Sequence, residues 1–251
     1  MTQITEPLYT RIEKHTNPTL VTLIHGHNSH GERDYLQSFL NPFRVVNYTL
    51  GWYETRRQQI GLNRWRSPTM TEEYGQALRM CRTAVEFLQP PKHIIVGHST
   101  GAAIAFAVAK EVPTDAVIAY LPLVDYPRLG AQMRRRLALS VGETDLHPES
   151  SLLENAFDTN IDSKEFNYKS FFGNWMRWSL DNAMNGCNTP ALFIAAQNDT
   201  VATPTEVLAA AQSYGGTCIT VRGKHIPTIR NATVAGALTV KLLQSTPYFQ
   251  K

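Results

Sequence analysis

Ser99 stands in a stretch of sequence that is typical of a catalytic nucleophile. Residues 97–101 read GHSTG, an apolar run at 94–96 precedes them, and an alanine-rich run at 102–109 follows. A serine at a sharp turn between a strand and a helix presents its hydroxyl at the edge of a sheet, and the flanking glycines leave room for a strained backbone. The pattern therefore predicts a nucleophilic serine, against the plainer interpretation of a glycine-rich turn that contains a serine.

A serine hydroxyl is a weak nucleophile unless a base lies next to it and an acid orients that base. Ligands of a parallel sheet gather beyond the carboxyl ends of its strands, so candidates must follow predicted strands. Asp199 follows the strand predicted at 191–196, and His225 follows the one predicted at 217–221. Asp125 also follows a predicted strand and stays open as an alternative acid.

Apolar runs alternate with amphipathic stretches along most of the chain. Strands without polar alternation, separated by helices, indicate a parallel sheet that is buried on both faces. The strands are predicted at residues 19–24, 43–48, 94–96, 116–121, 191–196 and 217–221, with a short edge strand at 8–15. The helices are predicted at 34–40, 69–88, 102–109, 204–214 and 231–243.

Two segments interrupt this alternation. Residues 126–188 contain no convincing strand but several short aromatic-rich pieces, which predicts a helical cap inserted into a core of residues 1–125 and 189–251. Residues 49–68 form a long irregular stretch, and loops of this length are commonly functional. Its arginines could receive an acidic substrate group, although most are expected to be solvated. They are Arg56, Arg57, Arg64 and Arg66.

Composition excludes several classes of function. A chain of 251 residues suits one α/β domain with a modest insertion. The net charge of +3 is too weak to imply nucleic acid or an anionic membrane, and the densest basic run, at 134–136, is expected to be a solvated helix face.

Cysteine and histidine usage gives no sign of a metal site. The three cysteines are odd in number and lack ligand spacing, and no histidine pair has the spacing of a zinc protease. We therefore expect no metal and no cofactor. No apolar leader or membrane-spanning segment is visible, so a cytoplasmic location and no stable membrane insertion are expected. The oligomeric state stays open.

Together these residues resemble the α/β-hydrolase superfamily, and more narrowly its lipase- and esterase-like members with a helical cap. The resemblance covers residues 19–245, and the order Ser99, Asp199, His225 is the order of that superfamily. The matching signals are His25-Gly26, residues 97–101, Asn198-Asp199 with Pro204, and Gly223-Lys224-His225.

The resemblance implies an α/β-hydrolase fold, a mostly parallel doubly wound sheet with an inserted helical cap. It implies Ser99 as the nucleophile, His225 as general base and then acid, and Asp199 as the group that fixes the imidazole tautomer. The expected oxyanion hole consists of the backbone N–H groups of Thr100 and His27.

The expected reaction is hydrolysis of a medium-sized, apolar carboxylic ester, a small-molecule substrate. The same triad also serves thioesterases, amidases, peptidases and carbon–carbon bond hydrolases, and a non-catalytic binder on this scaffold is a further alternative. Many relatives carry an Asp-x-x-Gly-x-Gly-x-Ser loop after the second strand, which this chain lacks, so the leaving group stays open. The candidate pocket residues are Asn28, Trp52, His98 and Trp175, of which His98 is expected mainly to pack.

Overall fold

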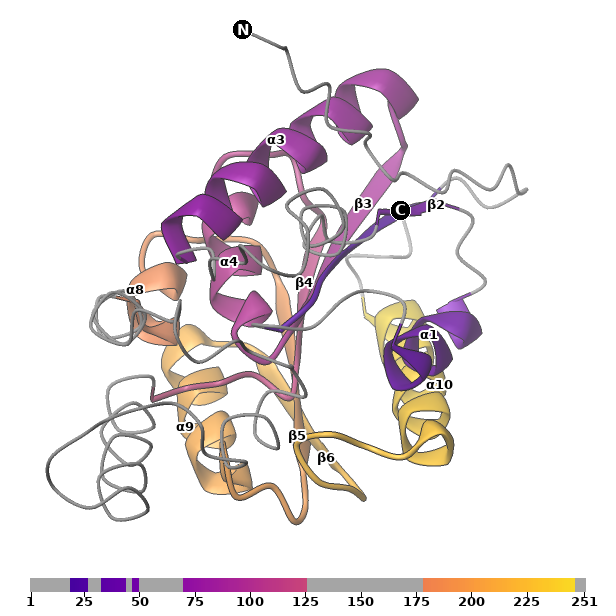
Figure 1. The fold of residues 1–251 in the computed structure, drawn as a ribbon, viewed down its shortest axis with the longest axis vertical. Helices are drawn as coiled ribbons and strands as arrows, with labels where there is room; N and C mark the ends of the chain where they lie inside the picture. Colours follow the sequence, from indigo (N-terminus) through magenta and orange to yellow (C-terminus); the bar gives the residue numbers. More distant parts are fainter. Residues whose placement is uncertain (1–18, 27–32, 44–46, 50–69, 126–177, 247–251) are drawn as a thin grey trace, which may run out of the picture.

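Parallel strands form the centre of the molecule. The computed structural model describes residues 19–26, 33–43, 47–49, 70–125 and 178–246. In this part of the chain the strand order is β2-β1-β3-β4-β5-β6, and every neighbouring pair is parallel, as predicted (Figure 1). The strands are β1 (Thr19–Ile24), β2 (Asn47–Thr49), β3 (Lys92–His98), β4 (Ala116–Tyr120), β5 (Ala191–Ala196) and β6 (Thr217–Val221).

Helices cover both faces of this sheet. Helices α1 and α10 lie on one face, and α3, α4, α8 and α9 lie on the other (Figure 1). A separate hydrophobic core fills each side. The helices are α1 (Asp34–Leu40), η1 (Asn41–Phe43), α3 (Met70–Leu88), α4 (Gly101–Ala109), α8 (Leu180–Met184), α9 (Pro204–Tyr214) and α10 (Ile229–Ser245).

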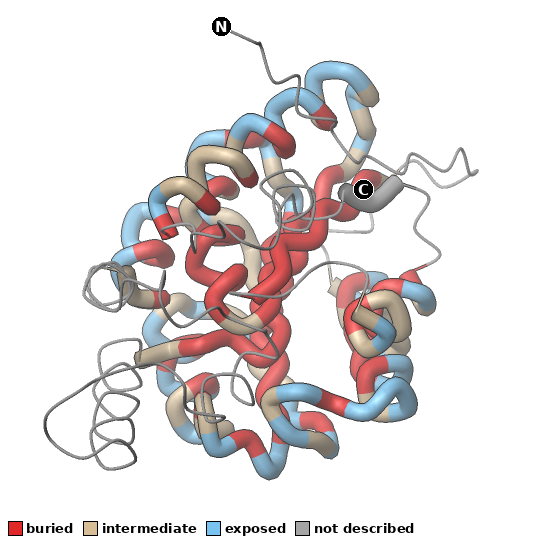
Figure 2. The backbone as a smooth tube through the Cα atoms, viewed as in Figure 1, coloured by how far each residue is buried: buried red, intermediate tan, exposed pale blue. Residues whose placement is uncertain are grey.

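The central strands are buried, apart from the first residues of β3 and β5, because both faces are covered (Figure 2). On the α1 side, Phe39 stacks on Tyr120 with ring centroids 4.0 Å apart. On the α4 side, Phe106 packs against Phe193 at 5.7 Å. Each fully buried aromatic side chain contributes on the order of 2–3 kcal/mol, so these contacts hold β4 and β5 in position between the helices.

One predicted strand is partly wrong. The sequence predicts an extended stretch at 43–48, but Phe43 lies in the 3₁₀ turn η1; strand β2 covers Asn47–Thr49, and residues 44–46 lie outside the described residues. Pro42 has a fixed φ that suits a helical turn, and Phe43 is buried with its ring 5.5 Å from that of Phe39. Burial against α1 therefore outweighs the β propensity of phenylalanine.

Strand β3 is longer than its apolar run indicates. It begins at Lys92 because the polar His93 is buried and satisfied on both ring nitrogens. Its Nε2 lies 2.9 Å from Thr22 Oγ1, and its Nδ1–H donates to the carbonyl oxygen of Pro113 at 2.9 Å. A hydrogen-bonded histidine is thus accommodated where periodicity alone ends the strand.

Several predicted features lie outside the described residues. They are the edge strand at 8–15, the arginines of the 49–68 stretch, and most of the proposed cap, 126–177. Helix α8 falls at the end of the proposed cap, and its Leu180, Ala183 and Met184 are buried in the core beside α4. Among the helices that the structure describes, none has the length and apolarity needed to cross a bilayer.

Candidate active site

Ser99 occupies a strained turn at the carboxyl end of β3. Its φ is +54°, a left-handed conformation that costs a residue other than glycine about 1–3 kcal/mol. Backbone hydrogen bonds hold it there: Ser99 N–H donates to Tyr120 O, and Ser99 O accepts from Leu123 N–H and Ala102 N–H. The turn is therefore fixed by β4 on one side and by α4 on the other.

The turn is flanked by Gly97 and Gly101, where nearby main-chain atoms leave no space for a side chain. A Cβ on Gly97 would stand 2.5 Å from Cα of Ala102. A Cβ on Gly101 would stand 2.3 Å from the carbonyl oxygen of Ile24. Because both obstacles are main-chain atoms, neither position has room for any side chain. The glycines let α4 start directly behind Ser99 and lie close to the end of β1.

Asp199 lies in the loop between β5 and α9 and is almost completely buried. Its Oδ1 accepts hydrogen bonds from the backbone N–H groups of Val201 at 2.8 Å and Ala202 at 3.0 Å. Its Oδ2 is 2.8 Å from Nδ1 of His225, and the aspartate side chain is 1% exposed. Three donors therefore satisfy a carboxylate that water hardly reaches, and they fix its orientation.

His225 lies between Asp199 and Ser99 and contacts both. Its Nδ1–H donates to Asp199, and its Nε2 lies 2.9 Å from Ser99 Oγ. A carboxylate only accepts, so Nδ1 carries the proton and Nε2 is left to accept from the serine hydroxyl. The structure places Asp199, and not Asp125, at Nδ1.

Backbone contacts join the loops that carry the acid and the base. Asn198 N–H donates to the carbonyl oxygen of Gly223 at 2.9 Å. Gly223 has φ of +145°, a conformation that glycine adopts readily and other residues rarely. The Asp199 loop and the His225 loop are thus held to each other as well as to adjacent strands.

His98, the last residue of β3, lies in the interior behind His225. Its side chain is 3% exposed, and its ring centroid is 5.9 Å from that of His225, 5.4 Å from that of Tyr35 and 5.7 Å from that of Tyr120. Burial lowers the pKa of His98 to about 3, and the charge that His225 acquires on protonation lowers it further. His98 is therefore neutral across the working range of pH, in agreement with the expectation that it packs.

Of the two predicted oxyanion donors, Thr100 lies among the described residues and His27 does not. Thr100 is buried and directly precedes α4, which places its backbone N–H at the start of that helix. His27 lies outside the described residues, as do the pocket candidates Asn28, Trp52 and Trp175. The neighbouring His25 donates from Nδ1 to the carbonyl oxygen of Gly26 at 2.8 Å, a hydrogen bond that braces the chain after β1.

Gly26 approaches the serine turn closely. A Cβ placed on it would lie 3.0 Å from Cβ of Ser99 and 3.2 Å from Nδ1 of His98. Gly26, two residues after the end of β1, therefore lies directly against the nucleophile turn.

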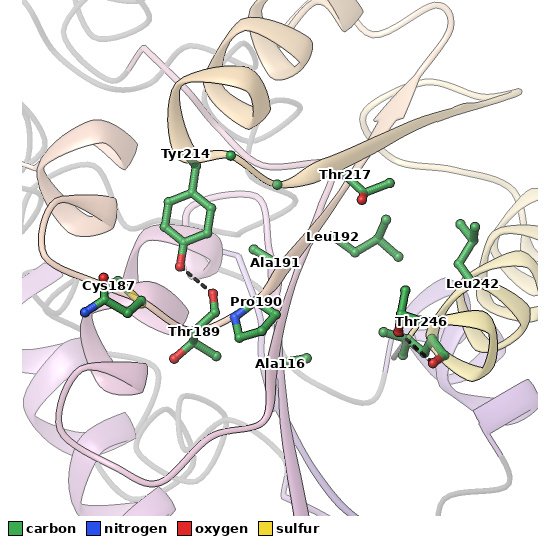
Figure 3. Close-up of a pocket in the computed structure, with 14 residues that line it drawn as sticks. Ala116, Cys187, Thr189, Pro190, Ala191, Leu192, Tyr214, Thr217, Leu242 and Thr246 are labelled. Carbon is green, nitrogen blue, oxygen red and sulfur yellow. Dashed lines mark hydrogen bonds between the residues drawn. The ribbon is translucent and has the colours of Figure 1, made fainter. Parts of the chain in front are cut away.

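A separate cavity of about 410 Å³ lies at the other end of the strands (Figure 3). It is lined by the first residues of β4, β5 and β6, whereas Ser99, Asp199 and His225 all follow carboxyl ends. The hydroxyl of Tyr214 points to the carbonyl oxygen of Thr189 at its edge (Figure 3). This cavity is therefore not the place where the serine would meet a substrate.

Sequence reasoning missed part of the surroundings of the histidine. Tyr35 and Tyr120 enclose His98, and no motif indicates this because one comes from α1 and the other from β4. Ile226 directly follows His225 and is 63% exposed, so it offers an apolar surface beside the imidazole. Its position next to His225 in the sequence could have indicated this apolar surface. Within the described ranges, no three His, Cys, Asp or Glu side chains gather closely enough to hold a metal ion.

Comparisons with known proteins agree with this architecture. The sequence model of a family described as "Alpha/beta hydrolase family" matches residues 23–238. The fold is similar to Est1E from Butyrivibrio proteoclasticus with ferulic acid bound, at 14% identity, a TM-score of 0.65 and coverage of 95% of each chain. It is also similar to the Pyrococcus furiosus esterase Pf2001, at 15% identity and a TM-score of 0.62, covering 91% of this chain and 82% of that one.

A hydrolase from Oleispira antarctica is similar over 97% of each chain, at 14% identity and a TM-score of 0.63. No significant match is found among proteins with curated functions. At these identities the solved structures establish a shared fold, which agrees with the fold class expected from the sequence.

Proposed function

The chain belongs to the alpha/beta hydrolase family, and from this we propose that it is a serine hydrolase that cleaves carboxylic esters through an acyl-enzyme. The observation that carries the proposal is the chain of contacts from Ser99 Oγ to His225 Nε2 at 2.9 Å and from His225 Nδ1 to Asp199 Oδ2 at 2.8 Å. These are the distances over which protons are transferred in general acid–base catalysis.

In the proposed reaction Ser99 Oγ attacks the ester carbonyl carbon while its proton passes to His225 Nε2. The tetrahedral intermediate collapses, and His225 returns that proton to the departing alkoxide, which leaves as an alcohol. Water then attacks the acyl-enzyme, gives a proton to His225 and releases the carboxylic acid. Ser99 recovers its proton in the last step. Asp199 remains ionised and stabilises the imidazolium that forms twice.

The negative oxygen of each tetrahedral intermediate needs donors. We assign this role to the backbone N–H groups of Thr100 and His27. Removal of one such donor typically costs about 3 kcal/mol of transition-state stabilisation. The position of Thr100 at the start of α4, where backbone N–H groups and the helix dipole favour negative charge, supports this assignment.

We propose a medium-sized, largely apolar acyl group as the part of the substrate that the site accepts. Support comes from the exposed Ile226 beside the base. Asn28, Trp52 and Trp175 remain the proposed pocket residues, whereas the fourth candidate, His98, is buried behind His225 and lines no pocket. Residues 126–188 remain the proposed cap between core segments 1–125 and 189–251. A cytoplasmic location is also proposed, since Cys81, Cys187 and Cys218 are all free thiols.

The test is a panel of p-nitrophenyl esters with acyl chains of two to twelve carbons, matched thioesters and anilides, and methyl ferulate, since one similar structure holds ferulic acid. We expect ester hydrolysis with kcat/KM highest at intermediate chain length, and no hydrolysis by Ser99→Ala. Faster turnover of thioesters or anilides would assign the enzyme to those classes instead. Saturable binding without turnover of any compound would indicate a binding protein and overturn the proposal.

A further inference from the structure

Strand β6 forms one edge of the sheet, since the strand order ends with it. Its burial differs from that of the inner strands. Thr217 and Thr220 are exposed, Cys218 and Ile219 are partly buried and only Val221 is buried, whereas every residue of β4 is buried. Helices α9 and α10 lie on the two faces of β6, so its exposed surface lies along the outer edge (Figure 1).

The outer edge of β6 carries the main-chain groups of Cys218 and Thr220. The carbonyl oxygen of Val221 accepts a hydrogen bond from Gln197 N–H, so the main chain of Val221 faces β5. Successive residues of a strand direct their N–H and C=O groups to opposite sides, so Ile219 also faces β5, and Cys218 and Thr220 face away from it. Among the described strands, none lies on that outer side.

The sequence of β6 does nothing to protect this edge. Natural proteins block exposed edges with charged side chains, proline or bulges. Residues 217–221 read TCITV and contain no charge and no proline. Their pairing with β5 is continuous from Thr217 to Val221, so no bulge twists the edge away. All but the cysteine are β-branched and favour extended pairing, so the edge is suited to receive a further strand.

A second copy of β6 fits this edge in the antiparallel orientation. Pairing about a two-fold axis at Ile219 sets Cys218 opposite the partner's Thr220, and symmetry repeats this pair. Both residues direct their main-chain groups outward, so each pair exchanges hydrogen bonds in both directions. Ile219 then faces its own counterpart as a non-hydrogen-bonded pair, with Cα atoms about 4.5 Å apart. The edge is therefore complementary to itself.

The same register is favourable for charge. Arg222 is exposed and directly follows β6, so it would lie beside the partner's Gly216. Gly216 follows Gly215, the left-handed C-cap of α9. The C-terminal end of a helix carries partial negative charge and favours a cation. β6 itself carries no charge, so like charges do not meet between the paired strands.

One flank of α10 extends the surface beside β6. Gly236 packs against the carbonyl oxygen of Phe39 in α1, and Leu238 lies about 200° further round the helix, on the opposite flank. Leu242, one turn beyond Leu238, lines the cavity of Figure 3 together with Thr217 of β6, so this flank faces β6. Leu238 is 42% exposed. Stable interfaces bury about 1,200–2,000 Å², and the α10 flanks, which the two-fold axis places on the same face of the joined sheet, add apolar area to that of the strands.

We propose that the chain forms a two-fold symmetric dimer through β6, in which the sheets of the two copies join into one. The occupant of the open edge is a second copy of this chain. The two β6 strands run in opposite directions, so the sites that contain Ser99 and His225 open toward opposite edges of the joined sheet. The inference goes beyond the proposed function and does not depend on it.

The first test is disulfide trapping under mild oxidation, in a Cys218→Ser background. Ile219→Cys should give a disulfide-linked dimer as the main product, because a Cα separation of about 4.5 Å suits a disulfide. Thr220→Cys in the same background is the control. Its two copies would lie about 8 Å apart, too far for a disulfide. Residue 220 is the more exposed of the two, so random collisions would give the opposite ranking. Cys81 and Cys187 are buried.

The second test is sedimentation velocity from about 1 to 100 μM, a range that spans the dissociation constants of weak and moderately stable dimers. The wild-type protein should have twice the mass of the chain at the upper concentrations. Thr220→Lys should sediment as a monomer, because a lysine blocks an open edge. Thr83→Lys is the control, since it adds the same charge at an exposed position of α3, beside β1 and β2, and should dimerise as the wild type does.

A wild-type monomer at every concentration would overturn the inference. So would a dimer that Thr220→Lys leaves intact, or faster trapping of Thr220→Cys than of Ile219→Cys. If Ile219→Cys does not fold, the lysine variants decide alone, with circular dichroism as the check of folding. Failure of the proposed function is seen separately, as absence of hydrolysis and of fluorophosphonate labelling in the wild-type protein.

Discussion

The hydroxyl of Ser99 lies 2.9 Å from Nε2 of His225, although 126 positions separate the two residues in the sequence. The sheet produces this proximity. Ser99 follows β3 and His225 follows β6, and because all the strands are parallel, both residues emerge at the same edge. In the proposed reaction, proximity of this kind gives a weakly nucleophilic hydroxyl a base that is already in place.

Asp199→Asn is expected to reduce kcat by about 10³- to 10⁴-fold with little change in KM. The amide would donate to Nδ1 and stabilise the wrong tautomer, in which Nε2 carries the proton and cannot accept from Ser99. Steady-state kinetics on p-nitrophenyl butyrate measure this. Asp125→Asn is the control and should keep kcat within about twofold, since Asp199 is the partner of Nδ1. The opposite ranking of the two variants would make Asp125 the acid.

Gly101→Ala is expected to destabilise the protein by at least about 1–3 kcal/mol. The new Cβ would stand 2.3 Å from the carbonyl oxygen of Ile24 and 2.5 Å from that of His25, and both are main-chain atoms that cannot move aside. Urea unfolding followed by circular dichroism measures the change.

Gly75→Ala is the matched control for this prediction. Gly75 lies within α3, and the nearest atom to its added Cβ is the end of the flexible Arg79 side chain at 3.7 Å. Alanine should stabilise this helix by about 0.5–1 kcal/mol. Equal effects of the two substitutions would contradict the close packing of the serine turn.

His98 is expected to make stability depend on pH. Its pKa is about 3 in the folded protein and near 6.5 in the unfolded chain. Between these values the unfolded chain binds the proton and the folded protein does not, so stability falls as the pH is lowered from 6.5. Above pH 6.5 the group does not affect stability. Between pH 6.5 and pH 3 the free energy of unfolding falls by up to about 1.4 kcal/mol for each unit by which the pH is lowered.

Thermal unfolding of wild-type protein and His98→Phe from pH 7 to pH 4 tests this dependence. The difference in stability should move in favour of the variant as the pH falls. The pKa of His93 is also lowered by burial, but His93 is present in both proteins and cancels in the difference. Parallel pH profiles would show that His98 is protonated in the folded state.

Local sequence was sufficient to predict most of the fold. Strands β1, β5 and β6 and helices α1 and α9 have the predicted limits, because each is a short apolar or amphipathic run ended by turn residues. Prediction failed where tertiary contacts outweigh local preference. Phe43 turns into η1 to pack on Phe39, and His93 extends β3 through its hydrogen bonds to distant residues.

The candidate site was predictable to the extent that its residues follow strands. The rule that chemistry gathers at the carboxyl ends of parallel strands selects Ser99 and His225 but leaves both Asp199 and Asp125 as candidate acids. The contact of Asp199 with Nδ1 of His225 distinguishes between them. The rule does not reveal the enclosure of His98 by Tyr35 and Tyr120, since those contacts depend on side-chain packing between α1, β4 and the loop after β6. Sequence periodicity carries no information of that kind.

The most direct test of the account is mass spectrometry of the intact protein after treatment with a fluorophosphonate, followed by peptide mapping. The account predicts one adduct per chain, located on Ser99, and none in Ser99→Ala. Labelling should also be much slower in His225→Ala, because the base that activates the hydroxyl is then missing. An adduct on another residue, or labelling of Ser99→Ala at the wild-type rate, would contradict the assignment of Ser99 as the nucleophile.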